Sequence, residues 1–169
     1  MTHVRITARK LVLRLVAGMM PALTAAAYAA GSHAGGHDHH ETEAAIGKPG
    51  VAARVRRTIT IEMHDSMRYT PANLRVRPGE TVRLVVRNQG RVKHELSLGT
   101  PQALRAHLEQ MRKFPDMEHD EPSQITLAPG ERGEIIWQFS EAGVVHFACL
   151  IHGHYEAGMR GTVQVGRKK

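Results

Sequence analysis

From Arg57 onward, apolar and polar residues alternate along the chain with a period of two. In the first such segment, every second position is apolar: Ile59, Ile61 and Met63. Successive side chains of a strand point to opposite faces, so this period is typical of a strand with one buried face. Similar segments follow at 74–76, 82–86, 94–98, 125–127, 135–139, 145–149 and 163–165. About eight short strands separated by turn sequences such as Pro78-Gly79 predict an all-β sandwich.

One segment interrupts this alternation and predicts a helix. Thr100 can serve as its N-cap, and Pro101 suits the first helical position. Leu104, Leu108 and Met111 recur at helical spacing and form one apolar stripe. We therefore predict one short helical insertion near 101–113, followed by an irregular loop.

The first thirty residues have the pattern of an export signal. A basic start precedes the apolar run 11–30, which ends in small residues including Ala27-Tyr28-Ala29. A membrane-spanning helix needs roughly 20 apolar residues, and Arg14 leaves this run too short. We predict that residues 1–29 are a signal peptide cleaved after Ala29 or Ala30, the alternative being a retained anchor.

Residues 30–56 are predicted to be a flexible, histidine-rich tail that precedes a domain at 57–169. The tail has small and polar residues, and four of its histidines lie close together next to acidic residues: His33, His37, His39 and His40. Flexible histidine clusters bind divalent metal ions loosely. Cleavage after Ala30 would also give the terminus Gly31-Ser32-His33, which can bind divalent copper. A solvated linker without a role is the alternative.

The charge of the chain indicates no nucleic-acid partner. The formal net charge is +7, and removal of the four basic leader residues, Arg5, Arg9, Lys10 and Arg14, lowers it to +3. The remaining charges are mixed in sign along the strands, and the chain has one Trp, three Tyr and three Phe. This is not the composition of a nucleic-acid surface. An exported chain with one cysteine suggests a protected thiol, for which metal ligation is one explanation.

Three candidate metal ligands fall in one short loop between two predicted strands. They are the thiol of Cys149, the imidazole of His154 and the thioether of Met159. Two histidines and one cysteine with a weak axial methionine form the copper site used in electron transfer. His94 is the candidate for the remaining histidine, because its strand parity points it inward. Each residue alone has a plainer explanation, as a buried thiol, a surface histidine or a core methionine.

The sequence resembles the plastocyanin/azurin group of cupredoxins. The resemblance rests on the motif Cys-x4-His-x4-Met at residues 149–159, followed by residues 161–165. The sequence is most similar to a periplasmic copper-tolerance subgroup, with which it shares residues 67–71, 78–82, 114–120 and the His94-Glu95 pair. The resemblance covers residues 57–166. It implies a Greek-key β-sandwich, a periplasmic role and one type 1 copper held by His94, Cys149, His154 and Met159.

Two positions depart from the patterns of these relatives. Many cupredoxins have asparagine after the first histidine ligand, whereas this chain has Glu95, as the copper-tolerance subgroup does. That subgroup tends to have proline where this chain has His152, which places a second imidazole beside His154. The spacing to Met159 favours His154 as the ligand. We expect His152 to lie on the outer rim.

A second group of copper-affine residues is a weaker candidate site. It consists of Met63, His64, Met67, Met117 and His119. Thioethers and imidazoles suit monovalent copper. Met63 has core parity, however, and packing alone is an alternative explanation for it.

These observations predict a non-enzymatic, periplasmic copper-binding protein acting in electron transfer, in copper tolerance or in both. The alternative is a copper carrier or sequestration protein without a redox role. A multicopper oxidase needs several His-x-His pairs, whereas His152-Gly153-His154 is the one such pair in the predicted domain. Expected partners are copper ions and a periplasmic redox protein or copper oxidase, with no nucleic acid and no membrane after cleavage of the signal.

Overall fold

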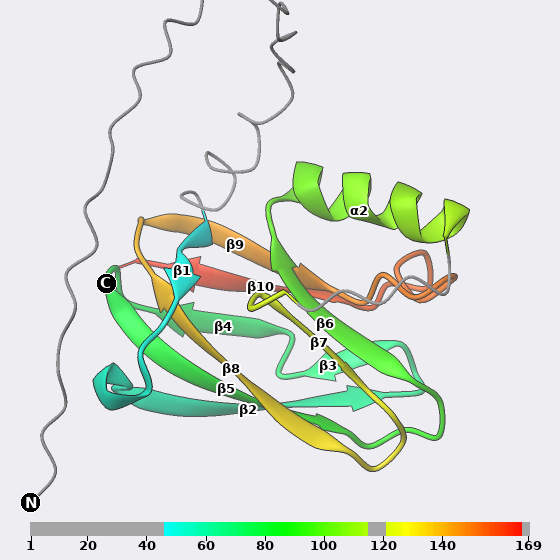
Figure 1. Cartoon of the computed structure of the whole chain (residues 1–169), viewed down its shortest axis with the longest axis horizontal. Helices are drawn as coiled ribbons and strands as arrows, with labels where there is room; N and C mark the ends of the chain where they lie inside the picture. Colours follow the sequence, from blue (N-terminus) through cyan, green and yellow to red (C-terminus); the bar gives the residue numbers. More distant parts are fainter. Residues whose placement is uncertain (1–45, 115–120, 167–169) are drawn as a thin grey trace, which may run out of the picture. The chain divides into compact units, whose positions relative to one another are not determined.

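Two five-stranded sheets make up the domain in the computed structural model, which describes residues 46–114 and 121–166 (Figure 1). The first sheet has the order β1 (Lys48–Pro49), β8 (Arg132–Phe139), β5 (Glu80–Asn88), β2 (Arg57–His64) and β3 (Arg68–Thr70). The second has the order β4 (Asn73–Val76), β10 (Arg160–Val165), β9 (Gly143–Ala148), β6 (His94–Gly99) and β7 (Gln124–Leu127). The predicted all-β sandwich is confirmed.

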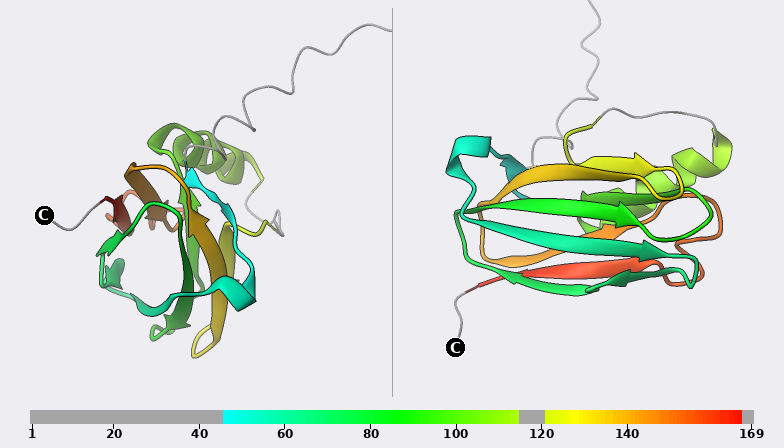
Figure 2. Two further views of the ribbon diagram at one scale, coloured as in Figure 1. Left: turned by 90° about the vertical axis from the view of Figure 1, so that its left-hand side faces the viewer. Right: turned by 90° about the horizontal axis from the view of Figure 1, so that it is seen from below.

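The chain crosses between the two sheets several times, as expected of a Greek-key sandwich. From β3 to β6 it passes to the second sheet, back to the first and again to the second, and it repeats this from β7 to β9. Two pairs, β2 with β5 and β4 with β10, are parallel, and the other pairs are antiparallel. The strands therefore run roughly side by side and end at two poles of the domain (Figure 2).

The predicted alternation places the apolar faces of both sheets in one core. Ile61 and Met63 of β2, Leu84 of β5, Phe139 of β8 and Phe147 of β9 are fully buried there. Burial of one such side chain contributes roughly 1.5–3 kcal/mol. The eight predicted strands are present, and two short strands, β1 and β3, are added to them.

The prediction of a structureless segment up to residue 56 is wrong for residues 46–56. Ile46 is buried and its carbonyl oxygen accepts a hydrogen bond from Trp137 Nε1 at 2.8 Å. β1 pairs with β8, and a 3-10 turn follows at Ala52–Arg54. Two residues of strand are too short to show a period, and their pairing depends on a strand about ninety residues away. The histidine-rich residues 30–45 lie outside the described residues.

The predicted helix is confirmed as α2 (Pro101–Lys113). Thr100 caps it, because its Oγ1 accepts a hydrogen bond from the backbone N–H of Ala103 at 3.1 Å. Leu104 and Leu108 pack on Ala148 and Leu150, on the outer side of the second sheet. Figure 1 shows α2 lying beside β6, all six residues of which are buried. Across the described ranges, no helix is both long and apolar enough to span a membrane.

Candidate metal centre

Three of the four predicted ligands meet at one pole of the sandwich. His94 is the first residue of β6, Cys149 directly follows β9, and His154 lies in the loop that leads to β10. One ligand atom from each of these residues lies within 4.8 Å of the others. Cys149 Sγ is 3.3 Å from His154 Nδ1, and the centroids of the two imidazole rings are 5.0 Å apart. At this pole, one thiol and two imidazoles therefore lie close enough together to bind one metal ion.

The imidazole of His94 has one nitrogen engaged and one available. Its Nε2 is 3.1 Å from Asp65 Oδ1. Its Nδ1 is buried and has no hydrogen-bond partner within residues 46–114 and 121–166. Native proteins rarely leave a buried polar atom without a partner unless a water or ion supplies one. The unpartnered Nδ1 is therefore the observation that fits a metal ligand best.

The thiol of Cys149 is fully buried. Burial raises its pKa to about 12, although backbone N–H groups of Ile151 and Glu95 oppose the shift. The N–H of Glu95 donates to Sγ at 3.4 Å. At neutral pH the metal-free residue is thus a thiol, and a metal that binds as to a thiolate must displace its proton.

The loop from Cys149 to Met159 is closed on itself by backbone hydrogen bonds. Cys149 N–H donates to the Met159 carbonyl at 3.1 Å, and Met159 N–H donates to the His154 carbonyl at 3.0 Å. Met159 is fully buried in the same core cluster as Cys149. Gly153 and Gly158 have φ of +82° and +97°, which favour glycine because it has no Cβ. The loop therefore brings the backbone of Met159 back beside Cys149 and His154.

His154 and His152 have different surroundings. His154 is partly buried, and burial lowers its pKa, with a further contribution from the neighbouring His94. A lowered pKa keeps the imidazole neutral, which is the form that binds metal. His152 is exposed, as expected of a residue on the rim, and it is not part of the group of three.

The carboxylate of Glu95 is buried on the face of β6 opposite to that of His94. It accepts hydrogen bonds from Ser97 Oγ at 2.8 Å, Gln124 Nε2 at 3.0 Å and Leu150 N–H at 3.3 Å. Leu150 directly follows Cys149, so Glu95 anchors the start of the ligand loop through its side chain and contacts the thiol through its backbone. The glutamate that stands here in place of the asparagine of many cupredoxins thus has a structural role.

The described members of the second predicted group are Met63, His64 and Met67, and each has neighbours that explain its position. Met63 is fully buried in the core, and Met67 packs against the core from a tight turn with φ of +58°. His64 lies beside the carboxylate of Glu62, with 3.7 Å between Nε2 and Oε2. Met117 and His119 lie outside the described residues. Packing is therefore sufficient to explain Met63.

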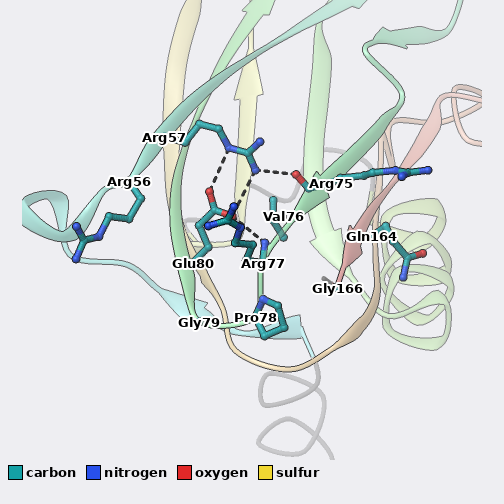
Figure 3. Close-up of a pocket in the computed structure, with 10 residues that line it drawn as sticks. All are labelled: Arg56, Arg57, Arg75, Val76, Arg77, Pro78, Gly79, Glu80, Gln164 and Gly166. Carbon is teal, nitrogen blue, oxygen red and sulfur yellow. Dashed lines mark hydrogen bonds and ion pairs between the residues drawn. The ribbon is translucent and has the colours of Figure 1, made fainter. Parts of the chain in front are cut away.

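A basic depression of about 1000 Å³ opens at the pole opposite the candidate metal centre (Figure 3). Its charged lining consists of Arg56, Arg57, Arg75, Arg77 and Glu80. Arg57 Nε pairs with Glu80 at 3.1 Å, and its Nη2 donates to the Arg75 carbonyl at 2.7 Å. β2 starts at this pole and ends beside Asp65 at the other, a distance of roughly 25 Å for eight strand residues. The depression is thus separate from the metal centre.

The raised pKa of Cys149 predicts that the metal-free protein loses stability in alkali. An unfolded thiol titrates near pH 8.5, whereas the folded one has a pKa of about 12. The thiol contribution to stability is thus complete below about pH 8.5 and is lost as pH rises toward the folded pKa. Urea unfolding at several pH values should show a steeper decline for the wild type than for Cys149→Ser. Equal declines would contradict the prediction.

The chain is similar to known copper-binding proteins. The family described as copper binding proteins, plastocyanin/azurin family, matches residues 55–166. The copper-resistant cuproprotein CopI of Rubrivivax gelatinosus is 51% identical over 134 residues, which cover 79% of this chain and 81% of the relative. A protein of the same name from Vibrio cholerae is 34% identical over 121 residues, covering 71% of this chain and 72% of the relative.

Solved structures show the same fold. Dithionite-reduced auracyanin from Roseiflexus castenholzii matches 67% of this chain and 99% of its own, with a TM-score of 0.58 and 19% identity. At this identity the match bears on the fold alone. The family match, in contrast, spans the strands and the loop that carry the two histidines and the cysteine. This chain is a cupredoxin: it belongs to the plastocyanin/azurin family of copper-binding proteins and is related to the copper-resistance protein CopI.

Proposed function

We propose that the chain holds one mononuclear type 1 copper through His94, Cys149, His154 and Met159. The observation that carries this proposal is the unpartnered, buried Nδ1 of His94 beside a thiol and a second imidazole. The donor set is also chemically suitable, because soft sulfur ligands accept monovalent copper and imidazole accepts both oxidation states. Copper bound there would supply one-electron redox chemistry.

The protein residues contribute a fixed and largely dry ligand set. Cys149, Met159 and His94 are fully buried; hydrogen bonds of the ligand loop hold the backbones of Cys149 and Met159, and pairing of β6 with β7 holds that of His94. His154 is the least buried of the four. We therefore infer that an electron enters and leaves through the exposed edge of His154, while the other three residues exclude water.

The proposed role is periplasmic electron transfer, copper tolerance or both, without enzymatic turnover. The export signal predicted at residues 1–29 and the names of the CopI relatives support this role. The proposed partners are copper ions and a periplasmic redox protein or copper oxidase. Sequestration of copper without a redox role uses the same ligands and is the alternative that experiment must separate.

Copper titration followed by redox titration tests the proposal. We expect a single tightly bound copper per chain, an intense visible band in the oxidised protein and reversible bleaching on reduction. A protein that takes up copper with no thiolate band would contradict the type 1 site. A colourless protein that holds monovalent copper tightly and resists oxidation would instead indicate sequestration.

The histidine-rich tail predicts additional, weaker copper equivalents. Replacing His33, His37, His39 and His40 together by asparagine in the full chain should remove these equivalents and leave the tightly bound copper in place, because the tail histidines are separate from the four proposed ligands. Calorimetric titration of the wild type and the variant with divalent copper measures both classes. If the two stoichiometries are equal, the tail is a linker without a role in metal binding.

A further inference from the structure

Asp65 is an acidic residue beside the candidate metal centre that the four-ligand proposal does not use. It lies in the tight turn between β2 and β3. Its Oδ1 is 3.1 Å from Nε2 of His94, the ring nitrogen other than the unpartnered Nδ1. The His94 side chain is fully buried, whereas that of Asp65 keeps 38% of its surface exposed. A carboxylate at the surface thus reaches inward to one buried imidazole.

The carboxylate of Asp65 is itself held from the opposite side by backbone N–H groups. The N–H of Arg91 donates to both of its oxygens, at 3.0 and 2.9 Å, and the N–H of Val92 donates to Oδ1 at 3.4 Å. Arg91 and Val92 belong to the connection between β5 and β6, two residues before His94. These backbone donors hold the carboxylate of Asp65 in addition to its contact with His94.

Gly90 provides the space in which the carboxylate and the imidazole meet. A Cβ added to Gly90 would overlap Asp65 Oδ1 and would lie 3.0 Å from His94 Nε2. A methyl group at this position would thus push the carboxylate away from the ring. The contact between Asp65 and His94 depends on three separate parts of the chain: the turn after β2, the residue at position 90 and the start of β6.

We propose that Asp65 is a positioning residue of the copper site. It accepts a hydrogen bond from His94 Nε2–H, which leaves Nδ1, the nitrogen without a partner, with its lone pair free for a metal. Histidine ligands of metals commonly donate their other ring N–H to such a partner, which fixes the tautomer and makes the ligand more basic. The negative charge also stabilises divalent copper more than monovalent copper, because the interaction grows with the charge of the ion. This inference rests on the proposed function.

The test uses the full-length protein with Asp65→Asn and Asp65→Ala. Glu141→Gln is the matched control, because it removes one negative charge from an exposed residue in the turn between β8 and β9. Mutation of the hydrogen-bond partner of a metal-bound histidine typically lowers metal affinity by roughly 10- to 100-fold. We expect Asp65→Ala to lose divalent copper affinity by about this factor and monovalent copper affinity by less, with Asp65→Asn in between. Each tenfold difference between the two losses raises the reduction potential by about 59 mV.

Competition titrations with chelators for each oxidation state, together with redox titration, measure these quantities. Gly90→Ala should reproduce the effect of Asp65→Ala, since it displaces the same carboxylate. If the Asp65 variants match Glu141→Gln in both affinities and in potential, the inference is wrong. Asp65→Asn keeps the size of the side chain and one acceptor, so it carries the test if Asp65→Ala does not fold. Failure of the wild type to form the coloured site would instead overturn the proposed function.

Discussion

Cys149→Ser is expected to abolish the intense visible absorption of the copper-loaded protein. The band requires charge transfer from a thiolate to divalent copper, and Cys149 is the single cysteine of the chain. We also expect copper affinity to fall by more than about 100-fold, because a direct ligand contributes more than the outer partners of a metal site do. Visible spectroscopy of the copper-loaded protein measures the band, and competition with a copper chelator measures the affinity.

The serine variant should keep its fold, which separates loss of the ligand from loss of the domain. Serine is close in size to cysteine, and the core on this side is built by Phe147, Met159 and their neighbours. The single tryptophan, Trp137, is buried, and its Nε1–H donates a hydrogen bond to the carbonyl oxygen of Ile46. Its fluorescence therefore reports whether the sandwich is intact. A folded Cys149→Ser protein that retains the band would refute the assignment of the thiol.

His154→Ala should destroy the type 1 spectrum, whereas His152→Ala should preserve it. The reason is geometric, because His154 Nδ1 is 3.3 Å from the thiol sulfur while His152 is exposed and outside the group of three. The two variants remove the same chemical group from the same loop, two residues apart, so each is the control for the other. Absorption and electron paramagnetic resonance of the copper-loaded variants decide between them.

A small shift in reduction potential is the largest effect expected of His152→Ala, because an imidazole on the rim can interact with the centre only through space. The opposite result, in which His152→Ala loses the spectrum and His154→Ala keeps it, would mean that the loop coordinates in a shorter register. In that case the position that corresponds to Met159, with four residues between it and the histidine, is Ala157, and the roles of Met159 and Ala157 would have to be reassigned.

The candidate ligands could be proposed from the sequence because each carries a local signal. The period of two fixes which side of a strand is buried, and it places His94 on the same side as Leu96. The spacing of Cys149, His154 and Met159 within one loop needs no knowledge of the rest of the fold. The helix 101–113 was likewise predictable, because its cap and its apolar stripe lie within the helix itself.

Which residues surround these candidate ligands depends on the tertiary structure alone. Asp65 reaches His94 because β2 and β5 are parallel neighbours, so the turn after β2 meets the connection after β5. Glu95 is buried because β6 has β7 and the start of the ligand loop beside it and α2 packed on the same sheet. Residues 46–50 are ordered by pairing with β8. Alternation along a strand specifies which face a side chain occupies, but contacts between segments far apart in the sequence depend on strand order and register, which only the folded chain defines.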